Sequence, residues 1–235
     1  MLAAAAFCPH PPVLVPEMAG SAVADLEPLR SACHAAVSTV GRRADRLVLL
    51  GSAATSAFHS PLARGSLQGY GVAVDVHLGS PACGGSVELP LSLTIGAWLV
   101  AEAMGERSEA VGFSVGPGFA ASRAALDLLA LAETERLGLI VMGDGTARRS
   151  TSAPGYLDAR AEPYDAAIEA ALREGDGDAL AALDEPLGAD LLAAGVPAWR
   201  AAGALLAGGE YDADLLYAQA PFGVGYFVAQ WTVRG

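Results

Sequence analysis

Short apolar runs alternate along this chain with longer segments that carry apolar residues at helical spacing. The runs predict strands that are buried on both faces and lie at residues 1–8, 47–50, 111–115 and 137–142. An alternating segment at residues 72–76 predicts a further strand, and residues 215–233 predict a strand, a turn and a strand. Helices are predicted at residues 20–40, 89–104, 120–136, 180–194 and 197–206, with another starting at Pro163.

This alternation predicts an α/β fold. We expect one domain over residues 1–235, in which helices cover both faces of a central mixed, largely parallel sheet.

Composition argues against a membrane-spanning protein. Hydrophobic residues make up 53% of the chain and the mean hydropathy is +0.39. Much of this is alanine, however, and no apolar run reaches the roughly 18 residues that a spanning helix needs. The opening segment has no basic residue and ends at Pro9, which argues against a signal peptide. We therefore expect a cytoplasmic protein.

Cysteine content and charge narrow the environment and the partners. The three cysteines, Cys8, Cys33 and Cys83, form no CxxC pair, which fits thiols in a reducing compartment. The net charge is −12 and every one of the 14 basic residues is an arginine. An acidic surface without lysine argues against a nucleic-acid partner and against docking on an anionic membrane.

The apolar run 137–142 stops at Gly143, Asp144 and Gly145, and this point is the predicted centre of the protein. In open α/β sheets, ligands bind beyond the carboxyl ends of the strands. Asp144, Thr146, Arg148 and Arg149 are therefore expected at the mouth of a cleft. The two arginines could bind a carboxylate or a phosphate. Alternatively, one arginine pairs with Asp144 or Asp158 and the other lies in water.

Two histidines are candidates for chemistry. Prolines surround His10 directly after the first strand, and such a rigid turn suits a metal ligand or an acid/base. The alternative is a histidine hydrogen-bonded to backbone at a strand end. His59 follows the second strand and could turn toward the same cleft. No metal motif with diagnostic spacing occurs.

Several blocks of this sequence resemble the class III extradiol ring-cleavage dioxygenase superfamily, of the catalytic-subunit type, and in particular its bacterial Memo-like branch. The matching blocks are Ala6–Pro16, Leu47–Ser56, Val141–Arg149 with Ala153–Tyr156, Tyr164 and Asp165, and Ala220–Val228.

The resemblance implies a site that has lost its metal. Active members of this family hold Fe(II) with two histidines and a carboxylate, and a further histidine acts as acid/base. Only the first histidine has a counterpart here, at His10. The second falls at Ala53, the acid/base histidine falls at Ala147, and the third ligand, a cysteine in Memo-like proteins, falls near Leu192–Gly195. One ligand of three does not hold ferrous iron.

We therefore expect a pseudoenzyme without a cofactor that binds a small polar or acidic molecule, or serves as an interaction module. The expected site consists of these residues: His10, Ser52, Thr55, Asp144, Thr146, Arg148, Arg149 and Tyr156. The alternative is an active metal-dependent oxidoreductase of the ring-cleavage type that binds Fe(II) through His10 and replacement ligands such as His59 or Asp144. Because the family often forms dimers, a homo-oligomer is a further expectation.

Overall fold

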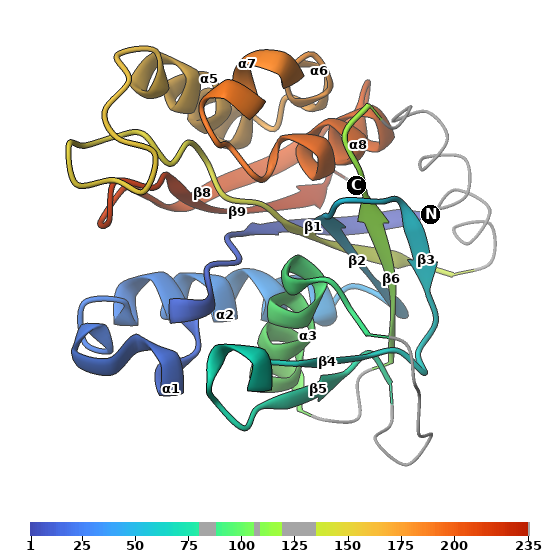
Figure 1. Ribbon diagram of the computed structural model, residues 1–235. Coiled ribbons are helices and arrows are strands. Elements are labelled where there is room, and N and C mark those ends of the chain that lie inside the picture. The colour runs from blue at the N-terminus through green and yellow to red at the C-terminus, as the bar shows by residue number, and fades with distance from the viewer. Residues whose placement is uncertain (80–87, 106–108, 119–134, 235) are drawn as a thin grey trace.

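The computed structural model describes residues 1–79, 88–105, 109–118 and 135–234 and contains a seven-stranded sheet (Figure 1). Its strands lie in the order β3 (Ala57–His59), β6 (Ala110–Val115), β2 (Arg46–Ser52), β7 (Leu137–Met142), β1 (Leu2–Cys8), β9 (Tyr226–Val233) and β8 (Tyr211–Gln219). The four strands from β6 to β1 are parallel, and the strands on either side of them pair antiparallel.

The parallel strands end at one edge of the sheet. Cys8 of β1 and Gly51 of β2 both pair with Met142 of β7, and Ser52 pairs with Val115 of β6. All residues of β6 and β7 are buried. Because these strands are parallel, they all end at the same edge of the sheet, and crossover connections join them. Because they are buried, both faces of the sheet need cover.

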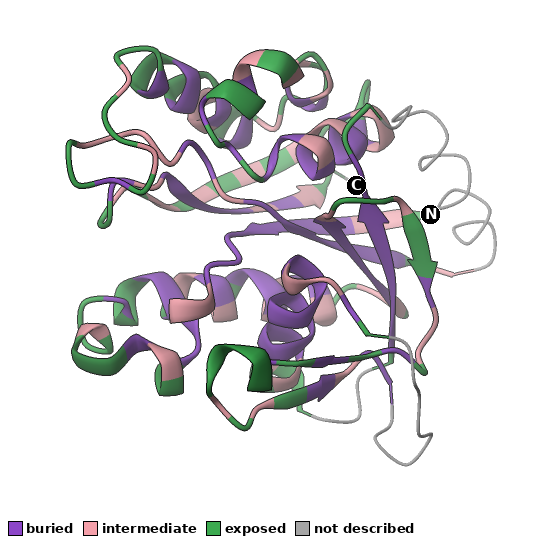
Figure 2. Ribbon diagram, in the orientation of Figure 1, coloured by how far each residue is buried: buried purple, intermediate pink, exposed green. Residues whose placement is uncertain are grey.

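Helices provide that cover (Figures 1 and 2). One face packs against the short helix α1 (Pro16–Ala19), α2 (Glu27–Gly41), α3 (Leu91–Met104) and a hairpin of β4 (Arg64–Ser66) and β5 (Asp75–His77). The other packs against α5 (Ala161–Glu174), α6 (Gly177–Ala181), α7 (Glu185–Asp190) and α8 (Val196–Leu206). Short 3-10 helices occur at Pro12–Leu14, Gly20–Ala22 and Gln68–Tyr70. The predicted α/β fold, with a mixed and largely parallel sheet between two layers, is confirmed.

Element boundaries differ from the sequence prediction where caps and prolines intervene. The helix predicted at 180–194 is wrong, because Asp176 and Asp184 each cap a new short helix by accepting a hydrogen bond from a backbone N–H. The residues after Asp190 then form a loop. The helix predicted from residue 20 begins only at Glu27, with Pro28 in its first turn.

Three strands also differ from the sequence prediction in their presence or in their bounds. The loop predicted at 53–61 contains β3, the strand predicted at 72–76 is β5 at Asp75–His77, and β8 begins at Tyr211 rather than at 215. The helix predicted at 120–136 lies almost entirely outside the described residues. Cys83 also lies outside them. Across the part of the chain that the structure describes, no helix is long and apolar enough to cross a membrane.

Candidate functional site

A pocket of about 410 Å³ lies where the carboxyl ends of the parallel strands meet α7 and α8. His10 follows β1, and Pro117 follows β6. Ser52 is the last residue of β2, and Ala53 comes directly after it. The segment around α7 and α8 closes the other side with Glu185, Ala189, Leu192, Ala193, Ala194, Val196 and Pro197. The site is therefore at the sheet edge that the sequence predicted, and its wall is mostly apolar.

Two glycines bring the covering segment onto the sheet. A Cβ atom added at Gly143 would lie 2.8 Å from the Cα of Gly195, and one added at Gly195 would lie 2.7 Å from the Cα of Gly143. The N–H of Gly195 donates to the carbonyl of Asp144 over 2.8 Å. Only glycine permits this approach of two backbones. It holds the loop before α8 directly over the turn that follows β7.

His10 is fixed against Asp144. The backbone N–H of His10 donates to Oδ1 of Asp144 over 2.7 Å, and Nδ1 of the ring lies 3.6 Å from the same oxygen. The imidazole is buried, and its Nδ1 has no hydrogen-bond partner among the described residues. The ring is thus oriented by its own backbone and by packing, and it contributes a polar group to the pocket wall.

Asp144 has a neighbourhood that favours its neutral form. Burial raises the pKa of its carboxyl group above the usual 3.8, and His10 opposes this through its charge and its N–H donor. On the side of α2, burial also raises the pKa of the Cys33 thiol, with Cys8 and Asp144 adding to the effect. The pKa of Tyr226 is raised by burial and by the nearby Asp144. Negative charge is therefore disfavoured throughout this part of the core.

Ser52 joins β2 to α8. Its Oγ accepts a hydrogen bond from the N–H of Ala198 over 3.2 Å, in the first turn of α8. Its carbonyl accepts from the hydroxyl of Ser92 over 2.8 Å. Ser52 thus lines the pocket and at the same time satisfies one of the free N–H groups of a helix N-terminus.

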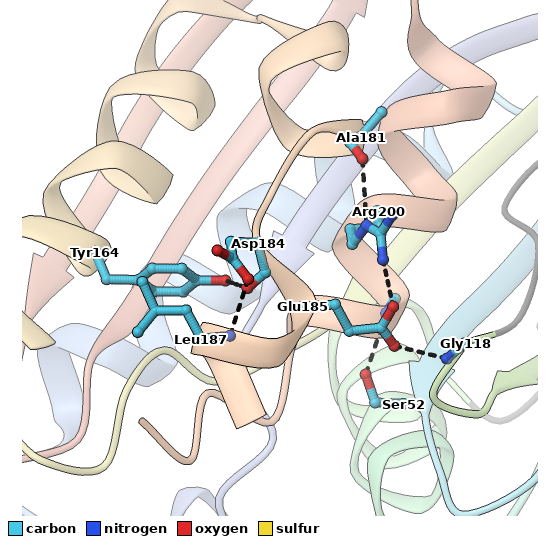
Figure 3. A network of polar contacts seen from close by, with 9 residues as sticks. Ser52, Gly118, Tyr164, Ala181, Asp184, Glu185, Leu187 and Arg200 are labelled. Atoms are coloured by element: carbon cyan, nitrogen blue, oxygen red, sulfur yellow. Dashed lines mark hydrogen bonds and ion pairs between the residues drawn. The ribbon is translucent and has the colours of Figure 1, made fainter. Parts of the chain in front are cut away.

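Glu185 is a charged pocket residue that the sequence prediction did not single out (Figure 3). Its Oε1 accepts from the N–H of Gly118 over 2.7 Å, and its Oε2 pairs with the guanidinium of Arg200. Arg200 also donates to the carbonyl of Ala181 over 3.3 Å. The contacts of Glu185 tie α7 to α8 and to the turn after β6.

Thr146 and Arg149 were expected in the cleft, but they bind the buried Asp165 of α5. Oδ1 of Asp165 accepts from the N–H of Thr146 over 2.9 Å, and Oδ2 accepts from the Thr146 hydroxyl and from Arg149, each over 3.0 Å. Arg149 also lies 3.6 Å from Glu162. Burial raises the pKa of Asp165, and these donors oppose the shift. Neither Thr146 nor Arg149 lines the pocket at His10.

The other expected site residues also lie outside that pocket. Arg148 donates to the carbonyl of Gly155 over 2.6 Å. Tyr156 is 74% exposed, and Thr55 is exposed. Neither arginine forms an ion pair with Asp144 or Asp158, so the alternative that the sequence left open is also wrong: Arg149 pairs with Asp165 instead. Of the expected site residues, only His10 and Ser52 line the pocket. Asp144 contacts His10 but does not line the pocket itself.

His59 lies away from His10. It is on the edge strand β3, where it pairs with Gly112 in the middle of β6. It is buried, its Nε2 lies 3.2 Å from the hydroxyl of Ser114, and burial lowers its pKa. Because β6, β2 and β7 separate β3 from β1, His59 does not line the pocket that contains His10.

The residues present at the pocket do not fit a three-ligand iron centre. Positions 53, 193 and 194 line it, and each is an alanine. Over the described ranges, no three histidine, cysteine, aspartate or glutamate side chains gather as a metal would require.

Comparison with known proteins gives information about the fold. No protein-family model matches the chain, and no curated protein matches it. The fold is similar to the crystal structure of the uncharacterized protein JW3007 from Escherichia coli K12, with a TM-score of 0.52 and 13% sequence identity. The similarity covers 97% of this chain and 99% of the other. At this identity the likeness concerns the architecture alone.

The contacts of Asp165 predict that Asp165→Asn destabilises the protein strongly. The amide would place an N–H₂ group against donors that now meet a carboxylate, so we expect the free energy of unfolding to fall by about 3 kcal/mol in urea denaturation. As a control, the exposed Asp212 pairs with Arg234, and Asp212→Asn should change the free energy of unfolding by less than about 1 kcal/mol. Equal effects of the two substitutions would contradict the structural role given to Asp165.

The largely enclosed carboxyl group of Asp144 predicts a pH dependence of stability. Its raised pKa means that the folded state binds a proton more tightly than the unfolded state does. The contribution of Asp144 to the free energy of unfolding therefore falls as pH rises from about 3.8 through its folded pKa. Asp144→Asn does not titrate and still accepts from His10. Urea unfolding between acid and neutral pH should show the variant gaining stability relative to wild type as pH rises. A difference that stays constant or decreases would contradict this.

Proposed function

We propose that this protein is a non-catalytic small-molecule-binding protein built on a class III extradiol dioxygenase-like fold whose Fe(II) ligands have been replaced. The proposal rests first on one observation. His10, Ala53, Ala193 and Ala194, which are far apart in the sequence, line a single pocket. These are the positions at which the resemblance puts the first histidine, the second histidine and the third ligand.

The chemistry of these positions supports binding without catalysis. A methyl group has no lone pair to donate to a metal, so of the positions that the resemblance assigns as ligands only His10 could bind a ferrous ion, which needs several nitrogen or oxygen ligands. Glu185 also lines the pocket, but its carboxylate is engaged by Gly118 and Arg200. The nearest further candidate, Asp144, already accepts the backbone N–H of His10 with its Oδ1. His59, the other replacement ligand that we considered, lies on β3 beside Ser114. We therefore favour the binding protein over the metal-dependent oxidoreductase.

The pocket itself has the properties of a small-molecule site. A volume of about 410 Å³ lies within the range of ligand pockets, and a mostly apolar wall with few polar groups is typical of them. Hydrogen bonds hold that wall in place from both β2 and the turn after β7. A pre-formed cavity binds with a smaller loss of conformational entropy than one that must be ordered.

The proposal predicts that a metal site can be restored by two substitutions. Ala53→His combined with Ala194→Glu places an imidazole and a carboxylate on the wall that carries His10, and Ala194 is exposed enough to accept the longer side chain. Isothermal titration with Zn²⁺ should show one site per chain, with an affinity at least about tenfold above that of the wild type. A second variant, Ala53→His with Ala193→Glu, tests the neighbouring position.

The matched control is Ala54→His with Ala182→Glu, which adds the same groups at exposed positions outside the pocket. Circular dichroism establishes that each variant is folded. If both restored variants fold but bind Zn²⁺ no better than the control, the three positions do not form a former ligand set, and the proposal is wrong.

A further inference from the structure

The pocket wall contains few polar groups, and the arginine next to it, Arg200, is already paired with Glu185. Apart from apolar side chains, the wall is made by His10, Ser52 and Glu185. Among the described residues, no arginine lines the pocket. An anionic ligand would therefore have to find its partners among helix N–H groups or in an arginine next to the wall.

The N-terminus of α8 has its N–H groups already engaged. Helix N-termini attract anions through free N–H groups, and Val196 and Pro197 of α8 are in the pocket wall. However, the N–H of Val196 donates to Ala193 over 3.3 Å, and that of Trp199 donates to Gly195 over 2.9 Å. The N–H of Ala198 donates to Ser52, as described above, and Pro197 has none.

The arginines around the site have partners of their own. Arg149 pairs with Asp165, and Arg148, which lies outside the pocket wall, donates to the carbonyl of Gly155. Arg200 is next to the pocket, but its guanidinium is paired with Glu185, which itself lines the wall (Figure 3). The side chains of Glu185 and Arg200 are 20% and 34% exposed, so water screens the pair only in part. Glu185 thus neutralises the cation that a bound anion would otherwise use.

We propose that the pocket takes an uncharged, mainly apolar molecule with one hydrogen-bonding group turned toward His10 and Ser52, and that Glu185 determines this specificity by neutralising Arg200. The inference rests on the proposed function, because it names the ligand class of the same pocket. It replaces the acidic ligand that Arg148 and Arg149 suggested from sequence. An anion bound here would lose its hydration and find no arginine in the wall to compensate its charge.

A pair of fluorescent probes with the same aromatic skeleton tests the ligand class. N-phenyl-1-naphthylamine is uncharged at neutral pH, and 8-anilino-1-naphthalenesulfonate adds one sulfonate. In 0.15 M salt, which screens the acidic surface, the neutral probe should bind the full chain at least about tenfold more tightly than the anionic probe. Equal or tighter binding of the sulfonate in the pocket would overturn the proposal.

Replacing either of two alanines with tryptophan establishes where the probes bind. Ala189 is exposed and lines the pocket, so Ala189→Trp should fill the cavity without disturbing the core and lower the affinity for the neutral probe at least about tenfold. Ala182→Trp adds the same side chain at an exposed position outside the pocket and should leave the affinity unchanged. Binding that survives Ala189→Trp would place the probe elsewhere and contradict the proposal.

The role of Glu185 has its own test. Glu185→Gln keeps an acceptor for Gly118 but removes the charge that neutralises Arg200, so the ratio of the sulfonate affinity to the neutral-probe affinity should rise about tenfold. Glu174 is exposed and lies outside the pocket. Glu174→Gln makes the same change in net charge and should leave both affinities unaltered. A ratio of affinities that does not respond to Glu185→Gln would refute the role of Glu185.

The outcomes separate this inference from the proposed function. If the sulfonate binds as tightly as the neutral probe and Ala189→Trp abolishes both, the small-molecule pocket stands and the ligand class is wrong. If neither probe binds, the pocket does not take small aromatic molecules, and both the inference and the binding function fail. The Zn²⁺ titration of the double variants at positions 53, 193 and 194 tests separately whether these positions once held a metal.

Discussion

The contact between Gly143 and Gly195 is the constraint on which the pocket depends. It joins the turn after β7, where Asp144 holds His10, to the loop that leads into α8. Because neither glycine has a side chain, the loop lies close enough for the alanines at 193 and 194 to form part of the wall opposite His10. Larger residues at either position would move α7 and α8 away from the sheet edge. The two backbone segments therefore set both the existence of the cavity and its small size.

Under the proposed function, the protein keeps the scaffold of a metal site but not its ligands. The strand ends, the glycine turn and the cap from Ser52 to α8 keep the shape of a site at the carboxyl edge of an α/β sheet. Among the described residues of its wall, only His10 and Glu185 carry nitrogen or oxygen groups that bind metals well, and Glu185 is paired with Arg200. The rest of the wall is mostly methyl and methylene groups. Charges around it are internally paired: Glu185 with Arg200, and Arg149 with Asp165. A cavity of this kind favours burial of apolar surface over recognition of charge.

The sequence was sufficient for the architecture and for the edge at which the site lies. Buried runs such as β7 and glycine turns such as Gly143–Gly145 depend on local pattern, which is why the sheet and the position of Asp144 could be predicted. The partner of the Arg149 side chain could not be predicted, because it is a buried carboxylate in α5 that becomes its neighbour only in the folded chain. For the same reason, nothing in the pattern around His59 showed that β3 would place it beside Ser114.

The helix predicted at 180–194 shows where closer attention to local chemistry would have helped. Asp184 followed by Glu185 and Pro186 is a typical helix start, and recognising it would have divided that segment and placed Glu185 in a first turn. The pairing of Glu185 with Arg200 and with the turn after β6 depends on tertiary packing. Elements set by local signals were thus within reach of the sequence, and the partners of charged side chains were not.

Elemental analysis of the native protein tests the central claim most directly. The chain should be expressed in medium supplemented with iron and zinc and purified without a tag or a chelator. A pocket that has lost its ligands predicts iron, zinc and manganese contents far below one ion per chain, unchanged in His10→Ala. One tightly held equivalent of any of these metals that disappears in His10→Ala would contradict the account.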